Sequence, residues 1–288
     1  MRRILRLAGR AILVALAAGF GCAAYIYLTL PDVRDLKTSN PATTAFIEIR
    51  AREAHDKGEQ PRRVQRWAPY ARISSHLKKA VLVAEDSAFW THGGVDFEQI
   101  KESMEVNFER MEFARGASTI TQQLAKNLYL SPSKNPIRKI RELLIARRLE
   151  AELTKQRILE LYLNVIEWGD GIYGADAAAR SYFRKPAADL DASESALLAA
   201  AIINPRVLDP GRPSPRLRRR QQMILQRMGG VTPPPVITEA PAPALAPVPD
   251  LPDVPPPATG APDVLPGQVV PIDKPSPAKP RGGGPGGA

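Results

Sequence analysis

Cysteine is almost absent from this sequence, which has one, Cys22, in 288 residues. A single cysteine excludes a disulfide framework, a thiolate zinc site and an iron–sulfur cluster, because each needs several sulfur atoms. The chain also lacks a P-loop and a dinucleotide-binding glycine motif, which argues against a nucleotide enzyme. Its histidines, His55, His76 and His92, are scattered. No metal site is therefore expected, and each histidine is interpreted as structural.

Proline is unevenly distributed, because 18 of the 29 prolines and 7 of the 20 glycines follow Gly230. Proline removes backbone donors, so residues 231–288 are predicted to be a disordered Pro-rich tail that the chemistry does not need. Acidic residues are also in deficit. Without the three basic and five acidic residues of the tail, residues 1–230 carry 37 Lys and Arg against 25 Asp and Glu, a net charge of +12. A basic folded part favours an anionic partner.

The N-terminus contains an uncharged run at residues 11–30, which follows a basic segment at residues 1–10. As a helix this run spans the roughly 30 Å hydrocarbon core, so it is predicted to be a retained transmembrane helix. The arginines before it place the N-terminus in the cytoplasm and the rest of the chain outside, beginning with a membrane-proximal segment at residues 31–66. The alternative is a cleaved signal peptide, since the run contains small residues. A membrane helix joined to a basic exterior domain indicates an anionic lipid substrate.

The folded part is predicted to be mainly α, because its apolar residues recur at helical spacing and strand-like runs are few and short. One apolar stripe continues from Leu77 to Ala88, and Ser118 or Thr119 is expected to cap a later helix. Asn135 and Thr154 are each followed by a helical pattern. The helices are expected at residues 77–88, 97–113, 119–128, 136–153, 155–165, 174–182, 193–203 and 215–228.

An acidic pair, Glu85 and Asp86, is the first candidate for chemistry. On a continuous helix Glu85, Phe89 and His92 share one face, and Asp86 points about 100° away, so one acid is expected to react and the other to support it. A solvated surface or a helix cap is the alternative for such a pair. A second segment carries Thr119, Gln123 and Lys126 as one polar stripe whose donors suit phosphate or sugar oxygens.

A third segment is basic and places Arg138 and Glu142 at positions i and i+4, with Lys139 beside them. The spacing allows a surface ion pair worth a few tenths of a kcal/mol, or a diphosphate-binding arginine oriented by the glutamate, and it does not decide between them. Further on, the apolar positions of residues 155–174 indicate packing, and Asn164 is interpreted as a helix-end cap.

These four segments, in this order, resemble the motifs of the family 51 peptidoglycan glycosyltransferases, and the short chain is similar to the monofunctional biosynthetic members of that family. The resemblance extends from Trp67 to Met228, which predicts a glycosyltransferase domain at residues 67–230. It implies a lysozyme-like helical domain with a membrane-embedded smaller lobe that acts on lipid II. Ala117 departs from the glycine usual in the family, as does the tail, and neither is expected to abolish activity.

The resemblance also implies residue roles and partners. Glu85 falls on the catalytic glutamate and Glu142 on the second one. The implied substrate-binding residues are Asp86, Phe89, His92, Thr119, Gln123, Lys126, Arg138 and Lys139. The expected partners are lipid II, the growing glycan chain, the bacterial inner membrane and other cell-wall synthesis proteins, with no nucleic acid. No cofactor is expected to be required, although a divalent cation, Mg²⁺ or Mn²⁺, could assist at the diphosphate.

The implied reaction is an inverting glycosyl transfer that makes a β-1,4 link, with Glu85 as general base and cations stabilising the departing lipid diphosphate. A muramidase or lytic transglycosylase is the nearest alternative, and the cationic motifs argue against it. A non-catalytic anchored scaffold is the other. Two Ser-x-x-Lys matches without Lys-Thr-Gly or Ser-Asp-Asn do not support a transpeptidase domain.

Overall fold

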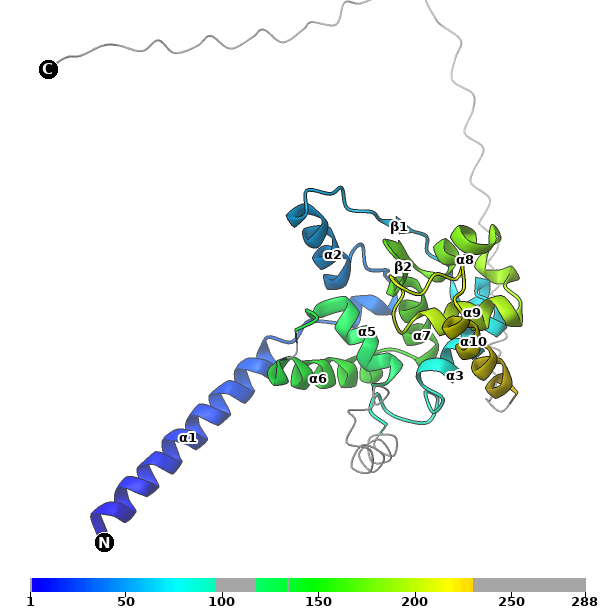
Figure 1. Ribbon diagram of the computed structural model, residues 1–288. Helices are drawn as coiled ribbons and strands as arrows, with labels where there is room; N and C mark the ends of the chain where they lie inside the picture. Colours follow the sequence, from blue (N-terminus) through cyan, green and yellow to red (C-terminus); the bar gives the residue numbers. More distant parts are fainter. Residues whose placement is uncertain (1, 97–117, 134, 230–288) are drawn as a thin grey trace, which may run out of the picture. The chain divides into compact units, whose positions relative to one another are not determined.

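The computed structural model describes residues 2–96, 118–133 and 135–229, and the side chains of residues 2–8 and 11 are not described. The predicted helix at residues 97–113, Ala117 and the predicted tail at residues 231–288 lie outside this part of the chain. Within it the fold is mainly helical, as predicted (Figure 1). The α-helices are α1 (Arg2–Leu28), α2 (Ala45–Asp56), α3 (Ser75–Glu85), α5 (Ile120–Tyr129), α6 (Pro136–Glu152), α7 (Lys155–Val165), α8 (Ala175–Phe183), α9 (Ala192–Ala201) and α10 (Pro215–Met228).

The core of the domain forms around α7 and α9. α7 packs against α5 and α8, and α9 packs against α3 and α10. Both helices are apolar on more than one face: every residue from Leu161 to Val165, and every residue from Ser195 to Ala201, is buried. The small side chains of α9 allow its neighbours to approach closely. α3, α5 and α10, which carry the charged motifs, are thereby fixed around one core.

A small sheet lies beside these helices. Its strands are β1 (Val64–Gln65), β2 (Glu167–Gly169) and β3 (Ile172–Tyr173), in the order β1-β3-β2, with β1 parallel and β2 antiparallel to β3. Gly171 makes the turn between β2 and β3 with a φ of +68°, and a Cβ there would lie 2.6 Å from the carbonyl oxygen of Arg62. Glycine is required at this turn for both reasons.

Short 3-10 turns at Arg34–Lys37, Tyr70–Arg72 and Ala187–Asp189 connect the longer elements. Asn164 was expected to cap a helix end, and instead it joins two segments. Its side-chain amide donates to the carbonyl oxygen of Ala68 at 2.8 Å and its carbonyl accepts from the Ala68 N–H at 2.7 Å. Because Asn164 is fully buried, these bonds satisfy an amide that would otherwise be costly to bury.

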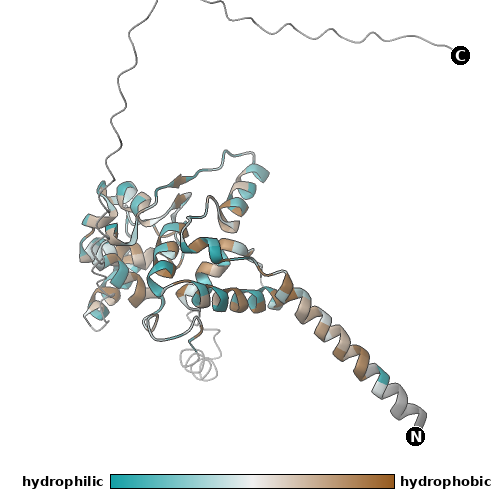
Figure 2. Ribbon diagram, turned by 180° about the vertical axis from the view of Figure 1, so that it is seen from behind, coloured by the Kyte–Doolittle hydropathy of each residue, from teal (hydrophilic) through white to brown (hydrophobic). Residues whose placement is uncertain are grey.

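α1 includes most of the predicted membrane segment at residues 11–30, and most of its coloured residues are hydrophobic (Figure 2). Most of its described side chains are exposed. Ile12, Phe20 and Leu28, for example, are 61%, 78% and 80% exposed. Across the described residues, however, no helix combines the length and the apolar character needed to cross a membrane. The predicted transmembrane helix is therefore not found in the described part of the chain.

The continuous helix expected through residues 77–88 is wrong, because α3 ends at Glu85. Asp86 has an extended φ of −166° and its carboxylate leaves the helix to bond elsewhere. The expected helical face shared by Glu85, Phe89 and His92 consequently does not exist. The apolar stripe that continues to Ala88 predicted one more helical turn. Instead, Asp86 bonds to the N–H of Ile120, which is distant in the sequence, and the helix ends before it.

Candidate active site

Glu85, the last residue of α3, lies on a cavity of about 450 Å³ between α3, α5, the end of α9 and α10. Its side chain is 14% exposed. The cavity is lined by Val83, Ala84, Glu85, Asp86, Ser87, Ser118, Gln123, Lys126, Ile202, Ile203, Arg220 and Arg227. The cavity therefore brings together the predicted residues Glu85, Asp86, Gln123 and Lys126, and the carboxylate of Glu85 lies among polar and cationic side chains.

Asp86 connects the first predicted motif to the second. Its Oδ2 accepts a hydrogen bond from the backbone N–H of Ile120, the first residue of α5, at 2.9 Å. A carboxylate at a helix N-terminus satisfies a free donor and is favoured by the helix dipole. Thr119 caps the same helix in a capping box with Gln122. These contacts set the position of α5, and with it the positions of Gln123 and Lys126, relative to Glu85.

Gln123 is held from both ends of its amide. Its Nε2 donates to Oε2 of Glu85 at 3.0 Å, and its Oε1 accepts from the hydroxyl of Tyr162 at 2.9 Å. Tyr162 is fully buried on α7. Its position in an apolar helical pattern predicted packing alone, because the sequence has no signal that separates a core tyrosine from a hydrogen-bond donor. The amide N–H thus faces the carboxylate of Glu85, and the hydroxyl of Tyr162 completes the hydrogen bonding of Gln123.

Burial shifts the pKa values of two side chains that line the cavity, Glu85 and Lys126, in opposite directions. Burial raises the pKa of Glu85 above its ordinary value, against the effects of Gln123, Arg220 and Lys126, which favour the charged form. Burial also lowers the pKa of Lys126, which the nearby Arg138 and Lys139 lower further, whereas Glu142 and Glu85 raise it. A carboxylate with a raised pKa is a better proton acceptor than an ordinary glutamate, which suits a general base.

The third predicted motif borders this cavity from α6. Glu142, whose side chain is 4% exposed, accepts from Arg138 at 2.6 Å and from Lys139 at 2.5 Å. Lys139 Nζ also lies 3.2 Å from Oγ of Ser118, which lines the cavity. The two cations are therefore held by one buried acid at the edge of the cavity. Glu142 is therefore more than one partner of a surface ion pair, because it is buried and pairs with both cations, while diphosphate binding by Arg138 stays a prediction.

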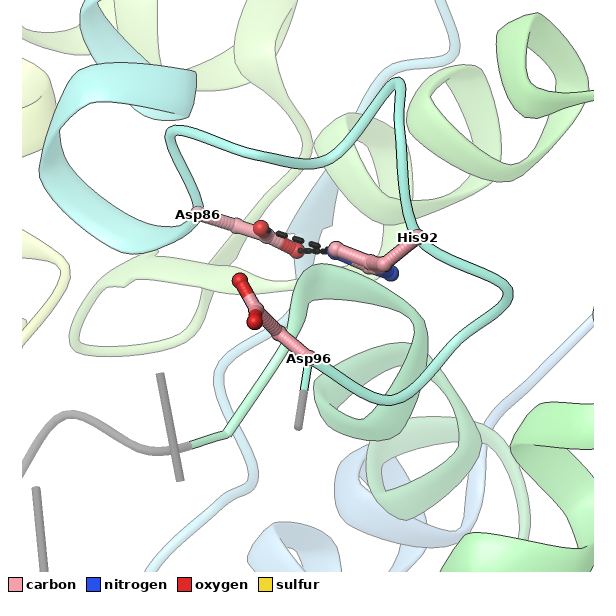
Figure 3. Close-up of side chains that lie close together, drawn as sticks. All are labelled: Asp86, His92 and Asp96. Atoms are coloured by element: carbon pink, nitrogen blue, oxygen red, sulfur yellow. Dashed lines mark hydrogen bonds and ion pairs between the residues drawn. The ribbon is translucent and has the colours of Figure 1, made fainter. Parts of the chain in front are cut away.

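His92 turns back toward Asp86 through a loop, and Figure 3 shows both side chains with Asp96. His92 Nδ1 accepts from the N–H of Gly94 at 3.1 Å, so its Nε2 carries the proton that it donates to Asp86, at 2.9 Å from Oδ1 and 3.0 Å from Oδ2. Oxygen and nitrogen atoms of Asp86, His92 and Asp96 all lie within 4.8 Å of one another. The hydrogen bonds of His92 and Asp86 explain why they meet, and no metal ion is assigned to them.

Phe89 and Thr119 are placed behind the cavity rather than on it. Phe89 is fully buried and packs edge-on against Trp90, with ring centroids 5.1 Å apart. Thr119 is 1% exposed and donates to the carbonyl oxygen of Gly94 at 2.8 Å. Of the predicted substrate-binding residues, Asp86, Phe89 and Thr119 thus have almost no surface to offer a substrate.

Arg220 is a residue of the site that the sequence analysis missed. It lies on α10, with Nη2 at 3.7 Å from Oε1 of Glu85. The only available signal was the run of arginines from Arg218 to Arg220 in a helix whose buried side is formed by Leu217 and Ile224. That pattern places Arg220 at the border of the buried stripe, but it does not show which element lies opposite.

Comparison with known proteins shows the family of the chain. The transglycosylase family model matches residues 53–229, more than half of the chain. The chain is 47% identical over 189 residues to the biosynthetic peptidoglycan transglycosylase of Dechloromonas aromatica, covering 66% of this chain and 82% of that relative. For the proteins of the same name from Laribacter hongkongensis and Azoarcus sp., the identities are 48% over 196 residues and 41% over 235 residues. These alignments cover 68% and 82% of this chain, and 86% and 100% of the relatives.

The matched region contains all the elements that build the cavity, from α3 to α10. The chain therefore belongs to the transglycosylase family, the peptidoglycan glycosyltransferases that polymerise glycan strands.

Proposed function

We propose that Glu85 is the general base of glycan-strand polymerisation. In this reaction Glu85 takes the proton from the GlcNAc 4-hydroxyl of the acceptor lipid II as that oxygen attacks C1 of the donor MurNAc. The C1–oxygen bond to the diphosphate breaks as the new bond forms, which inverts C1 and yields a β-1,4 link. The observation that carries the proposal is the carboxylate of Glu85, which is partly enclosed in the cavity and held by Gln123 at 3.0 Å, whereas Asp86 is buried and bonded to Ile120 and His92.

On the opposite side of the reacting carbon we place the leaving diphosphate against the cations of α5 and α6. Lys126 lines the cavity, Lys139 reaches its edge at Ser118, and Arg138 shares Glu142 with Lys139. Fixed cations stabilise the charge that develops on the departing diphosphate better in the transition state than in the ground state. Glu142 has the supporting role of holding Arg138 and Lys139 in place.

The remaining predicted residues are assigned to positioning. Asp86 and Thr119 fix the start of α5, and His92 holds Asp86 by a hydrogen bond. Phe89 packs against Trp90 in the loop between Asp86 and His92. We further propose that the protein itself requires no cofactor and that a divalent cation, Mg²⁺ or Mn²⁺, accompanies the diphosphate where one takes part. Lys126 and the pair on α6 would neutralise charge at the same place.

We also propose that α1 anchors the enzyme in the inner membrane with the catalytic domain in the periplasm. The exposed apolar side chains of α1 and the arginines near its start support this arrangement. A lipid-linked substrate requires the enzyme to work at the membrane surface. Other cell-wall synthesis proteins are the partners expected there.

Two substitutions test the proposed function. Glu85→Gln keeps the size and the hydrogen bond but cannot accept the proton, so lipid II polymerisation should fall by about 10²–10⁴ while lipid II binding survives. Lys126→Ala should lower turnover through lost charge stabilisation, and it should weaken binding of a diphosphate-containing donor analogue more than Glu85→Gln does. Circular dichroism confirms that both variants fold. Near-normal polymerisation by folded Glu85→Gln would disprove the base assignment. Polymerisation of lipid II by the parent protein would distinguish a synthase from a hydrolase and from a non-catalytic scaffold.

A further inference from the structure

The two carboxylate oxygens of Glu85 are faced by different elements. Gln123 of α5 donates to Oε2 at 3.0 Å, and Arg220 of α10 approaches Oε1 with Nη2 at 3.7 Å. The carboxylate is thus held between a neutral amide and a guanidinium. Lys126 of α5, which is assigned to the diphosphate, is the other cation whose charge acts on Glu85.

The Arg220 side chain makes few contacts that would stabilise the fold. Its distance to Glu85 is an ion-pair distance rather than a hydrogen bond, and no acceptor among the described residues bonds its buried Nε–H. A buried donor without a partner costs free energy. An arginine that served only to stabilise the fold would be expected to use this donor, so its position beside Glu85 needs another explanation.

We propose that Arg220 is a positioning residue for the general base: its guanidinium keeps the Glu85 carboxylate ionised and oriented while the donor substrate is bound. The inference rests on the proposed role of Glu85. An opposite charge within about 4–6 Å favours the ionised carboxylate, and here it acts against the burial that favours the protonated form.

The need for a second cation follows from the placement of the diphosphate. When the anionic diphosphate lies against Lys126, Arg138 and Lys139, it neutralises their charge and adds negative charge near Glu85. Both effects would favour protonation of Glu85 at the moment when the base must be ionised. Arg220 belongs to α10 rather than to the helices that carry these three cations, and it approaches Glu85 itself at 3.7 Å, so its charge is expected to remain available to Glu85.

Several other groups act on Glu85 and are present in every variant used to test the inference. Asp86 follows it in the chain, Gln123 and Lys126 face it from α5, Tyr162 interacts with it from α7, and Arg227 lines the same cavity from α10. A substitution that changes only Arg220 therefore isolates its contribution.

The experiment is the pH dependence of kcat and KM for lipid II polymerisation by the full-length protein and its Arg220→Gln and Arg220→Lys variants. Arg218→Gln is the matched control, because Arg218 is an exposed residue of the same helix that does not line the cavity. Arg220→Gln should move the acidic limb of kcat upward by about 1 pH unit, which makes polymerisation about tenfold slower below that limb, with KM changed less than about twofold. Arg220→Lys should move the limb by less than half as much, and Arg218→Gln should keep the parent profile.

A parent-like pH profile for Arg220→Gln would overturn the inference, and so would its failure to show a cooperative thermal transition, which would make Arg220 a structural residue. The Glu85→Gln variant distinguishes failure of the proposed role of Arg220 from failure of the proposed role of Glu85. If Glu85→Gln is inactive while the Arg220→Gln profile is unchanged, only the role of Arg220 fails. If folded Glu85→Gln polymerises lipid II normally, the base assignment fails and the role of Arg220 fails with it.

Discussion

Gln123 and Glu85 form a hydrogen bond of 3.0 Å between Nε2 and Oε2, which joins the second motif to the end of α3. The bond has a defined direction because an ionised carboxylate only accepts hydrogen bonds, and a Gln123 amide rotated by 180° would bring its oxygen toward Glu85. The Tyr162 hydroxyl supports the observed form by donating to the other end of the amide at 2.9 Å. A buried core residue therefore contributes to the environment of the proposed base.

We predict that Tyr162→Phe lowers polymerisation by about threefold to tenfold, because Gln123 loses the donor that fixes its amide and a single hydrogen bond contributes about 0.5–1.5 kcal/mol. Steady-state kinetics with lipid II measure this effect, which should be in kcat. Tyr70→Phe is the matched control, since the Tyr70 hydroxyl is also buried but has no hydrogen-bond partner among the described residues. Equal turnover by the two variants would contradict the role of Tyr162.

Local signals in the sequence predicted several helix starts correctly. Asn135 caps α6 by accepting from the N–H of Ile137 at 2.8 Å, and Thr154 caps α7 by accepting from the N–H of Arg157 at 3.2 Å. Such caps are contacts within three residues, so the sequence contains all of the information. The apolar periodicity of α7 is equally local.

The end of α3 could not be predicted in the same way. It depends on Asp86 reaching the N–H of Ile120, which is 34 positions further along the chain. The role of Tyr162 and the approach of Arg220 also arise from contacts between distant segments. Residue type and spacing identified the charged groups, but only the packing of the helices shows which of them share a cavity.

Asp86→Ala is predicted to destabilise the domain by about 2–3 kcal/mol, because α5 loses its charged N-terminal acceptor and His92 loses its partner. Urea denaturation followed by circular dichroism measures the change. Asp86→Asn keeps an acceptor for the Ile120 N–H and should cost less than Asp86→Ala. If both variants unfold at the parent urea concentration, Asp86 does not hold α5 in place.

Glu85→Gln is predicted to raise the melting temperature at pH 8 although it should strongly lower polymerisation. Burial raises the pKa of Glu85 in the folded state, so the ionised carboxylate destabilises that state at any pH above the raised pKa. This cost disappears as the pH falls through the folded-state pKa toward the unfolded-state value. The variant should therefore melt about 2–4 °C higher than the parent for each kcal/mol of cost at pH 8, and the difference should shrink at pH 4. A variant that melts lower at pH 8 would show that Glu85 stabilises the fold.

The junction between α1 and the domain depends on two arginines of α6. Arg148 donates to the carbonyl oxygens of Tyr27, Leu30 and Pro31 at 3.3–3.4 Å, and its guanidinium lies 4.9 Å from the centre of the Tyr27 ring. Arg141 donates to Thr29 at 2.9 and 3.0 Å. These bonds satisfy carbonyls that the end of a helix leaves without partners.

We predict that Arg148→Ala loosens this junction without unfolding the domain. In the detergent-solubilised protein, chymotrypsin should cleave after Tyr27 several-fold faster than in the parent, because local opening of the helix end exposes the backbone to the protease. The melting temperature of the domain should remain within about 2 °C, since α6 keeps its buried face of Ile145 and Leu149. Arg147→Ala is the matched control, because Arg147 is an exposed neighbour on the same helix. Equal cleavage rates for the two variants would show that Arg148 does not secure the end of α1. A melting temperature that falls only in Arg148→Ala would show that Arg148 stabilises the whole domain rather than the junction.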